Sequence, residues 1–533
     1  MRFSKNDELL NLKTAVINGT DHKYCENVLI SLGLKKAFIL FNNHFFFGYR
    51  DLYNQDIIQK KFKTVVNVFE VHLKKLYKKY SCEQLVIALG GIYSKLEDIR
   101  LMNAHLKTNQ TENLEIIQDI VYGCSVADLM GRKIKCIIET AVLKNNKKRF
   151  IINFTNLDYK RFVILLYYYS IFMFYDSRKN LSKKYENGIT DFYIFPNDLN
   201  SLNTVIANKD NNISKTYTHY NYDSGIGNNV DECFNNAFRI EKGISFKEFN
   251  NLMNGIIKSC KEKNLVKSKI QKEQFDSILL KNYKDINLER FHNTCVLTNL
   301  NIENKEEKLY KNNGKYRLDT TPLIDIGKDY YIVIKGFISN SQNYWNNVHA
   351  IGLTPYLSES KDSIQLSSEK IIKKITKMLE NDIVKIFKTI NLNVEVYMNK
   401  KTKDIFSSKN IQNNEWDIIV VDHINKFIFN TEAKFISTSL TESGLSNDLK
   451  KIVGDSKNSY VSKFEKRIKI IKEHKNEFLT FCKANDSYRI ENLMVTSKFI
   501  ELDVESSSRN FKIIHYDRLK KYLLKTYYNE KKS

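Results

Sequence analysis

Two acidic residues and a lysine stand at the ends of two apolar runs in the last third of the chain. Asp417 is near the start of the first run, and Glu432 and Lys434 are at the end of the second. Carboxylate oxygens are hard ligands that suit Mg²⁺, which takes one or two carboxylates and keeps several waters. A metal held there polarises a phosphoryl oxygen and activates a bound water, and a lysine stabilises charge that develops on the phosphate. This set of groups is suited to hydrolysing a phosphodiester bond.

The two runs, Trp416–Val421 and Phe427–Ala433, are rich in Ile, Val and Phe and flank the polar segment Asp422–Lys426. This pattern predicts a β-hairpin. Side chains two positions apart on a strand point to the same face. The hairpin therefore brings Asp417 beside the Glu432–Lys434 pair. The alternative interpretation is a solvated cross-strand pair on an edge strand, with Asp417 as a strand-start residue.

Hydrophobic periodicity around the hairpin predicts further elements. These are a helix over Glu369–Thr389, a strand over Leu392–Met398, a helix through Tyr460, Phe464, Ile468 and Ile471, a strand over Asn492–Ser497, and a strand over Lys512–His515 that leads, through a cap at Asp517, into a helix over Arg518–Tyr527. The predicted order is helix, strand, strand, strand, helix, strand.

Asp417, followed fifteen positions later by Glu432-Ala433-Lys434, resembles the motif of the PD-(D/E)xK nuclease superfamily. That motif is an acidic residue, a gap across a hairpin, and then acid-any-Lys, and the family core has the same element order. Trp416 stands where the family pattern has proline. The resemblance covers roughly residues 367–527, about a third of the chain.

The resemblance implies a metal-dependent nuclease with a restriction-endonuclease-like core, a mixed sheet flanked by helices. It implies that Asp417 and Glu432 bind Mg²⁺, or alternatively Mn²⁺, and that Lys434 is the catalytic lysine.

In that family the first core helix often supplies another acidic metal ligand. Glu380 is the candidate, because it borders the apolar face of its helix, and Glu369 and Asp382 are its rivals. An ordinary solvated helix carboxylate remains the alternative for Glu380. Glu415, two positions before Asp417, is either a further ligand or a charge at the strand edge.

The helix after the hairpin carries basic residues that are candidates for holding nucleic-acid phosphates: Lys463, Lys466 and Arg467. The alternative is the solvated side of an amphipathic helix.

The whole chain of 533 residues has a formal net charge of +23. That balance favours nucleic acid as partner, before a membrane. DNA is preferred to RNA, since no aromatic RNA-binding motif of the RRM type is present. The competing explanation of the charge is a composition rich in Lys, Asn, Ile, Tyr and Phe. A second copy of the chain or a partner protein stays open as a further partner.

The eight cysteines include no Cys-x-x-Cys pair and predict reduced thiols of a cytoplasmic protein. The most apolar run, Phe162–Tyr175, is fourteen residues long. Spanning a bilayer takes about 20 residues, so the run predicts a buried helix and no membrane segment.

Overall the chain is predicted to be an α/β protein, with the nuclease-like domain at residues 365–533 after a larger mixed, mainly helical N-terminal region. That region divides into residues 1–150, of unknown role, and a mainly helical part, 151–350, with a polar insert near 197–229. Its predicted elements are a hairpin at Leu34–Gly48, a helix at Phe62–Tyr80, a strand at Leu85–Leu89, helical spacing over Phe246–Tyr283, a hairpin at Thr320–Val333 turning at Gly327–Asp329, and a linker at Gly352–Ser368.

The predicted function is a metal-dependent DNA endonuclease that acts as a restriction or phage-defence effector. The alternatives are a nucleic-acid-binding protein that keeps a nuclease fold without cutting, and an RNA-directed nuclease.

Overall fold

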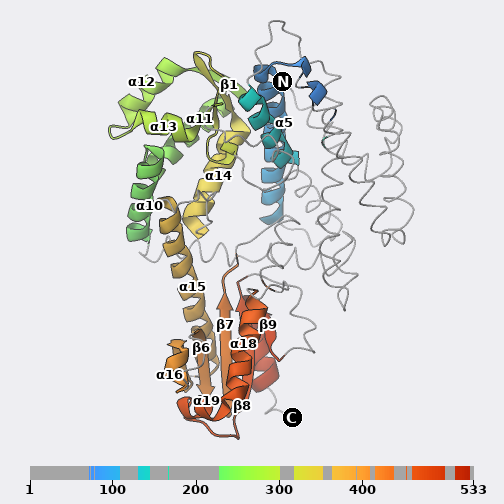
Figure 1. Ribbon diagram of the computed structural model, residues 1–533, viewed down its shortest axis with the longest axis vertical. Coiled ribbons are helices and arrows are strands. Elements are labelled where there is room, and N and C mark those ends of the chain that lie inside the picture. The colour runs from blue at the N-terminus through green and yellow to red at the C-terminus, as the bar shows by residue number, and fades with distance from the viewer. Residues whose placement is uncertain are drawn as a thin grey trace, which may run out of the picture. The chain divides into compact units, whose positions relative to one another are not determined.

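The computed structural model describes residues 71–108, 130–144, 227–299, 317–351, 363–407, 414–436, 459–497 and 510–528, with a few single positions missing, together with Leu166 and Ile452 (Figure 1). These residues belong to two compact units. The N-terminal unit includes Cys233–Asn346 and the C-terminal unit includes Gln365–Ser533. The predicted hairpin at 34–48, most of the helices at 62–80 and 162–175, and most of the polar insert lie outside the described residues.

The N-terminal unit contains a four-stranded sheet in the order β1-β4-β3-β2. Its strands are β1 (Lys267–Gln271), β2 (Val296–Leu297), β3 (Leu323–Asp325) and β4 (Tyr330–Ile334). The described helices of this region are α5 (Cys82–Thr108), α10 (Gly227–Lys242), α11 (Phe246–Glu262), α12 (Lys272–Asn282), α13 (Leu288–Cys295) and α14 (Lys335–Ile351).

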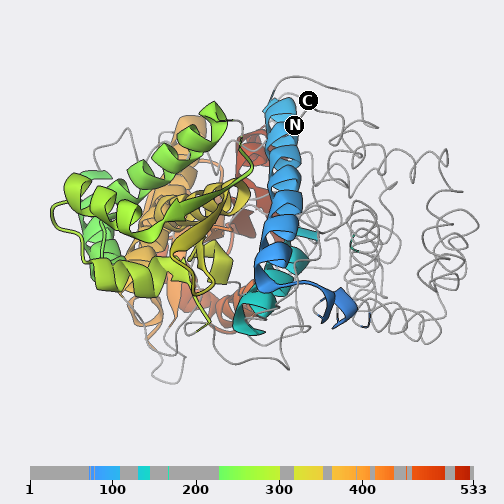
Figure 2. The same cartoon turned by 90° about the horizontal axis from the view of Figure 1, so that it is seen from above.

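The predicted hairpin at Thr320–Val333 is confirmed, because β3 and β4 pair antiparallel around Gly327, whose φ is +77°. The predicted strand at Leu85–Leu89 is wrong, since these residues lie inside α5, the long helix shown in blue in Figure 2. A short apolar run does not distinguish a strand from a buried helix. Gly90 lets α5 approach β4, because a Cβ there would lie 2.7 Å from the side chain of Ile334.

The prediction of continuous helical structure over Phe246–Tyr283 is also wrong. Strand β1 separates α11 from α12 and pairs antiparallel with β4 along the edge of the sheet. Its residues alternate between exposed and half-buried positions and include two lysines, so no apolar period identifies it as a strand.

The C-terminal unit is built on a five-stranded mixed sheet in the order β5-β6-β7-β8-β9. β5 (Glu395–Lys401), β6 (Glu415–Asp422) and β7 (Phe427–Lys434) pair antiparallel, whereas β7, β8 (Arg489–Thr496) and β9 (Lys512–His515) pair parallel. Its helices are α15 (Ser363–Ile390), α16 (Thr402–Ile405), α18 (Tyr460–Glu473), α19 (Lys475–Phe481) and α20 (Tyr516–Leu523), which a π-helical turn over Leu524–Tyr528 follows.

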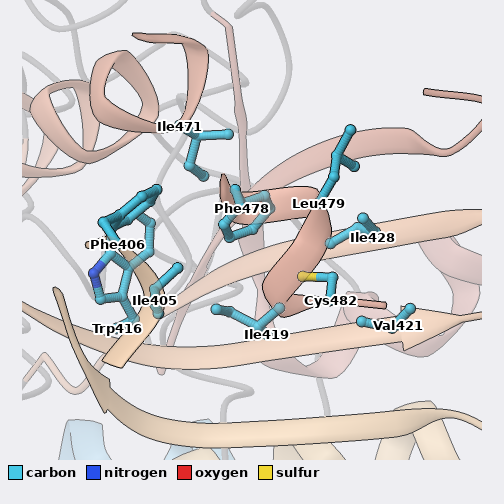
Figure 3. Packing of buried hydrophobic residues seen from close by; sticks show 10 residues of the cluster. All are labelled: Ile405, Phe406, Trp416, Ile419, Val421, Ile428, Ile471, Phe478, Leu479 and Cys482. Atoms are coloured by element: carbon cyan, nitrogen blue, oxygen red, sulfur yellow. The ribbon is translucent and has the colours of Figure 1, made fainter. Parts of the chain in front are cut away.

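Helices cover both faces of this sheet. α15 buries Ile375, Leu379 and Phe387 at helical spacing, and the Phe387 ring lies 5.1 Å from the ring of Phe429 on β7. The other face meets α18 and α19, where Ile471 and Phe478 pack in one cluster with residues of β6 and β7 (Figure 3). The mixed α/β character predicted for this region is confirmed.

Several predicted boundaries need correction. α15 begins at Ser363, so the end of the predicted linker is helical. β5 begins at Glu395, because Asn391 accepts a bond from the backbone of Asn393 in a turn that precedes the strand. Asp517 does not cap the last helix, whose N-cap is His515.

The described cysteines are free thiols, as predicted: Cys82, Cys136, Cys233, Cys260, Cys295 and Cys482. None of the helices in the described ranges combines the length and apolar character needed to cross a bilayer.

Candidate active site

The hairpin of β6 and β7 brings Asp417, Glu432 and Lys434 together. The two strands pair in register up to Ile418 and Thr431, so continuing the register by one residue places Asp417 opposite Glu432. The Lys434 Nζ lies 3.3 Å from Asp417 Oδ2 and forms an ion pair with Oε1 of Glu432. The backbone N–H of Ala433 donates to Asp417 Oδ2 at 2.9 Å, which fixes the aspartate against the end of β7.

All three side chains are largely withdrawn from water. Only 1% of the Glu432 side chain is exposed, against 13% for Asp417 and 21% for Lys434. Burial raises the pKa of Glu432, an effect that the charge of Lys434 opposes. Burial lowers the pKa of Lys434, but the charges of Glu432 and Asp417 outweigh it and hold the pKa above its ordinary value. The lysine is therefore a charged donor at the site.

Arg467 completes the cluster from α18. Its Nη1 forms an ion pair with Oε2 of Glu432, and 13% of its side chain is exposed. Lys463 and Lys466, the other predicted phosphate ligands on this helix, are exposed. The structure thus separates Arg467, which contacts the buried carboxylate, from two lysines on the surface.

Glu380 is the carboxylate of α15 that comes near this cluster. It is buried, and burial together with the charge of Asp417 raises its pKa to about 7. A hydrogen bond from Asn399 opposes this shift. Of its rivals, Asp382 pairs with Lys385 at 2.8 Å, and Glu369 lies eleven residues earlier, about 16 Å along the helix axis. Glu415 is exposed, and its charge is a smaller contribution to the pKa of Glu380.

Two residues of the site were absent from the sequence prediction. Asn399 has a φ of +52°, and the β5–β6 ladder has no bridge at the Asn399–Asp417 position between its flanking pairs. Asparagine tolerates this conformation better than most residues, but nothing local in the sequence indicates it. Tyr460, at the start of α18, places its ring 5.7 Å from the Lys434 Nζ. Hydrophobic periodicity places Tyr460 on the apolar face of α18 and indicates no role for it in the site.

The donor set suits a hard divalent cation of the Mg²⁺ type. Asp417 and Glu432 offer carboxylate oxygens. Burial, with a further contribution from the charge of Asp417, raises the pKa of Glu380 near them. Within the described ranges, no group of three or more His, Cys, Asp or Glu side chains is placed to hold a metal ion by itself. In this arrangement Lys434 and Arg467 engage both oxygens of Glu432. A two-carboxylate site completed by water is what these residues fit.

No protein-family model, curated protein or solved structure matches this chain. Function must therefore be inferred from the side chains themselves. The cluster joins three carboxylates, a lysine and an arginine from α15, β6, β7 and α18 at one end of a mixed sheet. Such an arrangement can bind a cation and an anionic substrate side by side.

Proposed function

We propose that this protein is a metal-dependent endonuclease that hydrolyses phosphodiester bonds in DNA, with a restriction-endonuclease-like core in its C-terminal unit. The observation that carries the proposal is the convergence of Asp417, Glu432 and Lys434 at the end of the β6–β7 hairpin. The sheet around them supports it, because α15, β5, β6, β7, α18 and β8 follow the order expected for that core.

Asp417 and Glu432 are the residues that would hold Mg²⁺ or Mn²⁺, and a bound metal would supply Lewis-acid stabilisation and an activated water. Lys434 contacts both carboxylates, so its ammonium stands where charge develops on the phosphate. Glu380 changes protonation near neutral pH because its pKa is about 7. A cation beside Asp417 would favour the ionised form of Glu380 and recruit it as a further ligand.

Arg467 and Lys434 favour the ionised form of Glu432, against the effect of burial, which raises its pKa. A carboxylate that is 1% exposed needs a counter-charge to remain charged, and Arg467 and Lys434 each supply one. If a metal were bound to Glu432, Arg467 and Lys434 would be the cations available to a phosphate oxygen, which a guanidinium can contact through two donors.

The net charge of +23 suits a polyanionic substrate. By analogy with large nuclease-fold proteins of this layout, the proposal includes a cytoplasmic restriction or antiviral defence role.

The test is cleavage of supercoiled plasmid, linear duplex DNA, single-stranded DNA and RNA in Mg²⁺, Mn²⁺ or EDTA. Wild type is compared with Glu432→Ala and Lys434→Ala, and with Asp382→Ala and Lys385→Ala as controls. The control pair lies on α15, and the Lys385 side chain is 70% exposed. Metal-dependent cutting that only the first two substitutions abolish supports the proposal, whereas cutting that survives both overturns the assignment of the site.

The engagement of both Glu432 oxygens by cations favours one alternative, a nucleic-acid-binding protein that does not cut. That alternative predicts salt-sensitive binding without cleavage on every substrate and metal. It also predicts that Mg²⁺ leaves the thermal unfolding midpoint unchanged, whereas a two-carboxylate metal site predicts a Mg²⁺-dependent increase that Asp417→Asn removes.

A further inference from the structure

The first half of α15 carries a row of lysines that ends at the candidate active site. Lys370, Lys373 and Lys377 are exposed, and Glu380 follows them on the same stripe of the helix. Successive members are three or four positions apart, which places them above one another along one side of a helix. The lysine stripe, defined as these three residues, therefore leads directly to the carboxylate that senses the charge of Asp417.

The lysine stripe makes no ion pair within the described part of the chain. The segment between Glu369 and Glu380 contains no acidic residue. Neither the three lysines nor the half-exposed Lys374 forms an ion pair with a described residue, whereas Lys385, farther along α15, pairs with Asp382. A solvated helix surface commonly mixes both signs of charge, so a one-sign row beside a cluster of carboxylates indicates a polyanion.

The dimensions of the row fit a nucleic-acid backbone. Lys370 and Lys377 are seven residues apart, which is about 10 Å along the helix axis. One strand of B-form DNA presents about three phosphates over that length, since they recur roughly every 3.4 Å along its axis. Three ammonium groups on flexible stems can thus each meet one phosphate.

We propose that the lysine stripe of α15 binds the phosphate backbone of one strand of duplex DNA and directs it toward Asp417, Glu432 and Lys434. This inference rests on the proposed function, because it assigns the substrate of the same site a path along α15. The stripe contacts backbone only, so it contributes affinity and register without reading sequence.

The test compares two triple variants that each remove three positive charges. Lys370→Gln/Lys373→Gln/Lys377→Gln removes the stripe. Lys388→Gln/Lys403→Gln/Lys472→Gln removes exposed lysines at the far end of α15, on α16 and at the end of α18. Binding of a fluorescein-labelled DNA duplex of roughly 30 base pairs is measured by anisotropy in EDTA across a salt series.

The stripe variant is expected to bind at least about tenfold more weakly near 0.1 M salt, and its slope of log affinity against log salt should shrink by about 2 to 3. The control should stay within about twofold, and Lys→Arg at the three stripe positions should preserve binding. Equal losses of affinity in both Gln variants, or an unchanged salt slope in the stripe variant, would overturn the role of the stripe in DNA binding. Thermal melts of both variants exclude unfolding as the cause.

Because binding in EDTA requires no chemistry, this result is independent of the cleavage assay. Loss of binding in the stripe variant of a protein that never cuts supports the stripe and rejects the nuclease. Normal binding by the stripe variant of a protein that does cut rejects the stripe alone. A single-stranded probe bound more tightly than the duplex, with the same loss in the stripe variant, would overturn the assignment of duplex DNA.

Discussion

The two ends of the five-stranded sheet shift the pKa of a glutamate in opposite directions. At the end with the β6–β7 turn, Glu395 lies 2.8 Å from the Lys483 Nζ and 3.2 Å from the Nε2 of His423. The hydrogen bond from Lys483 is the largest cause that lowers its pKa to about 2. At the other end, burial and Asp417 raise the pKa of Glu380 to about 7. The same residue type in one unit thus shows shifts of opposite sign.

The difference lies first in burial, which is the largest cause of the raised pKa of Glu380, and then in the charges that surround each glutamate. The turn end gives Glu395 a lysine and a hydrogen-bonded histidine, His423, and it ties Asp422 to the backbone N–H groups of Ile424 and Asn425. The site end places three carboxylates against Lys434 and Arg467. Ion pairs occur at both ends, so their presence does not identify a functional site. Negative charge that the fold leaves in excess is the better indicator.

The largest contrast is expected in catalysis. Asp417→Asn should lower the cleavage rate about 10²- to 10³-fold, since it removes a negatively charged oxygen ligand from the proposed metal site. Glu395→Gln, at the turn end, should leave the rate within about twofold. Initial rates of plasmid nicking in Mg²⁺ measure both, and equal losses would mean that the two ends do not differ in function.

A second contrast concerns the free energy of unfolding. Arg467→Ala should cost about 3 kcal/mol, because it leaves the buried Glu432 with one counter-charge fewer. Lys483→Ala should cost less than about 1 kcal/mol, since the Lys483 side chain is 70% exposed. Urea unfolding measures both values, and Arg467→Lys should recover part of the loss. A larger cost for Lys483→Ala would reverse the comparison.

The pH dependence of stability should have opposite signs at the two ends. Between its ordinary pKa of 4.5 and about 7, Glu380 holds a proton in the folded protein that the unfolded chain releases, so its contribution lowers stability as pH rises through that window. Glu395 contributes stability that is fully present above pH 4.5 and is lost as pH falls toward 2. In EDTA at about pH 8, Glu380→Gln should therefore raise the free energy of unfolding, by about 1–3 kcal/mol, and Glu395→Gln should lower it.

Thermal melts from about pH 4.5 to 8 measure this contrast. The stabilisation by Glu380→Gln should disappear toward the acid end of that range, because both states of the wild type are then increasingly protonated at this position. Destabilisation by Glu380→Gln at the alkaline end would contradict the raised pKa.

The smallest contrast compares two tyrosines. Tyr460→Leu removes the ring near the Lys434 Nζ and should cost about 0.5–1 kcal/mol of transition-state stabilisation, a two- to fivefold slower cleavage. Tyr460→Phe should preserve the rate. Tyr488→Phe, which removes the hydroxyl 2.9 Å from His423 Nδ1, should leave cleavage unchanged. Cleavage kinetics distinguish the three variants, and a slow Tyr460→Phe would assign the role to the hydroxyl instead of the ring.

The sequence predicted the parts of the site that depend on local pattern. Apolar runs of Ile, Val and Phe bounded by polar turn residues marked both strands of the hairpin, and the period of two placed Glu432 and Lys434 on one face. The apolar face of α15 located Glu380 at its border. These features need only neighbours within one element or across one turn, which is why β6 and β7 lie within one residue of their predicted bounds and α15 covers its predicted range.

Features that depend on tertiary partners were not predictable. Helical periodicity places Arg467 on the polar face of α18. Only the packing of α18 on the sheet brings its side chain to Glu432. The polar strand β1 pairs with β4, and the helix that contains Leu85–Leu89 lies against β4 at Gly90. The left-handed backbone of Asn399 is likewise set by its position opposite Asp417.

The pairing of Glu432 with Arg467 also distinguishes local from distant contacts in the site. Asp417 and Lys434 are seventeen positions apart and meet through one hairpin, so their contact closes a short loop. Arg467 is 35 positions beyond Glu432, and the parallel partner β8 comes later still. A chain that stops before α18 carries the acidic motif without its full complement of positive charge. The crossover from β7 to β8 carries α18, so it supplies the arginine that completes the cluster around Glu432.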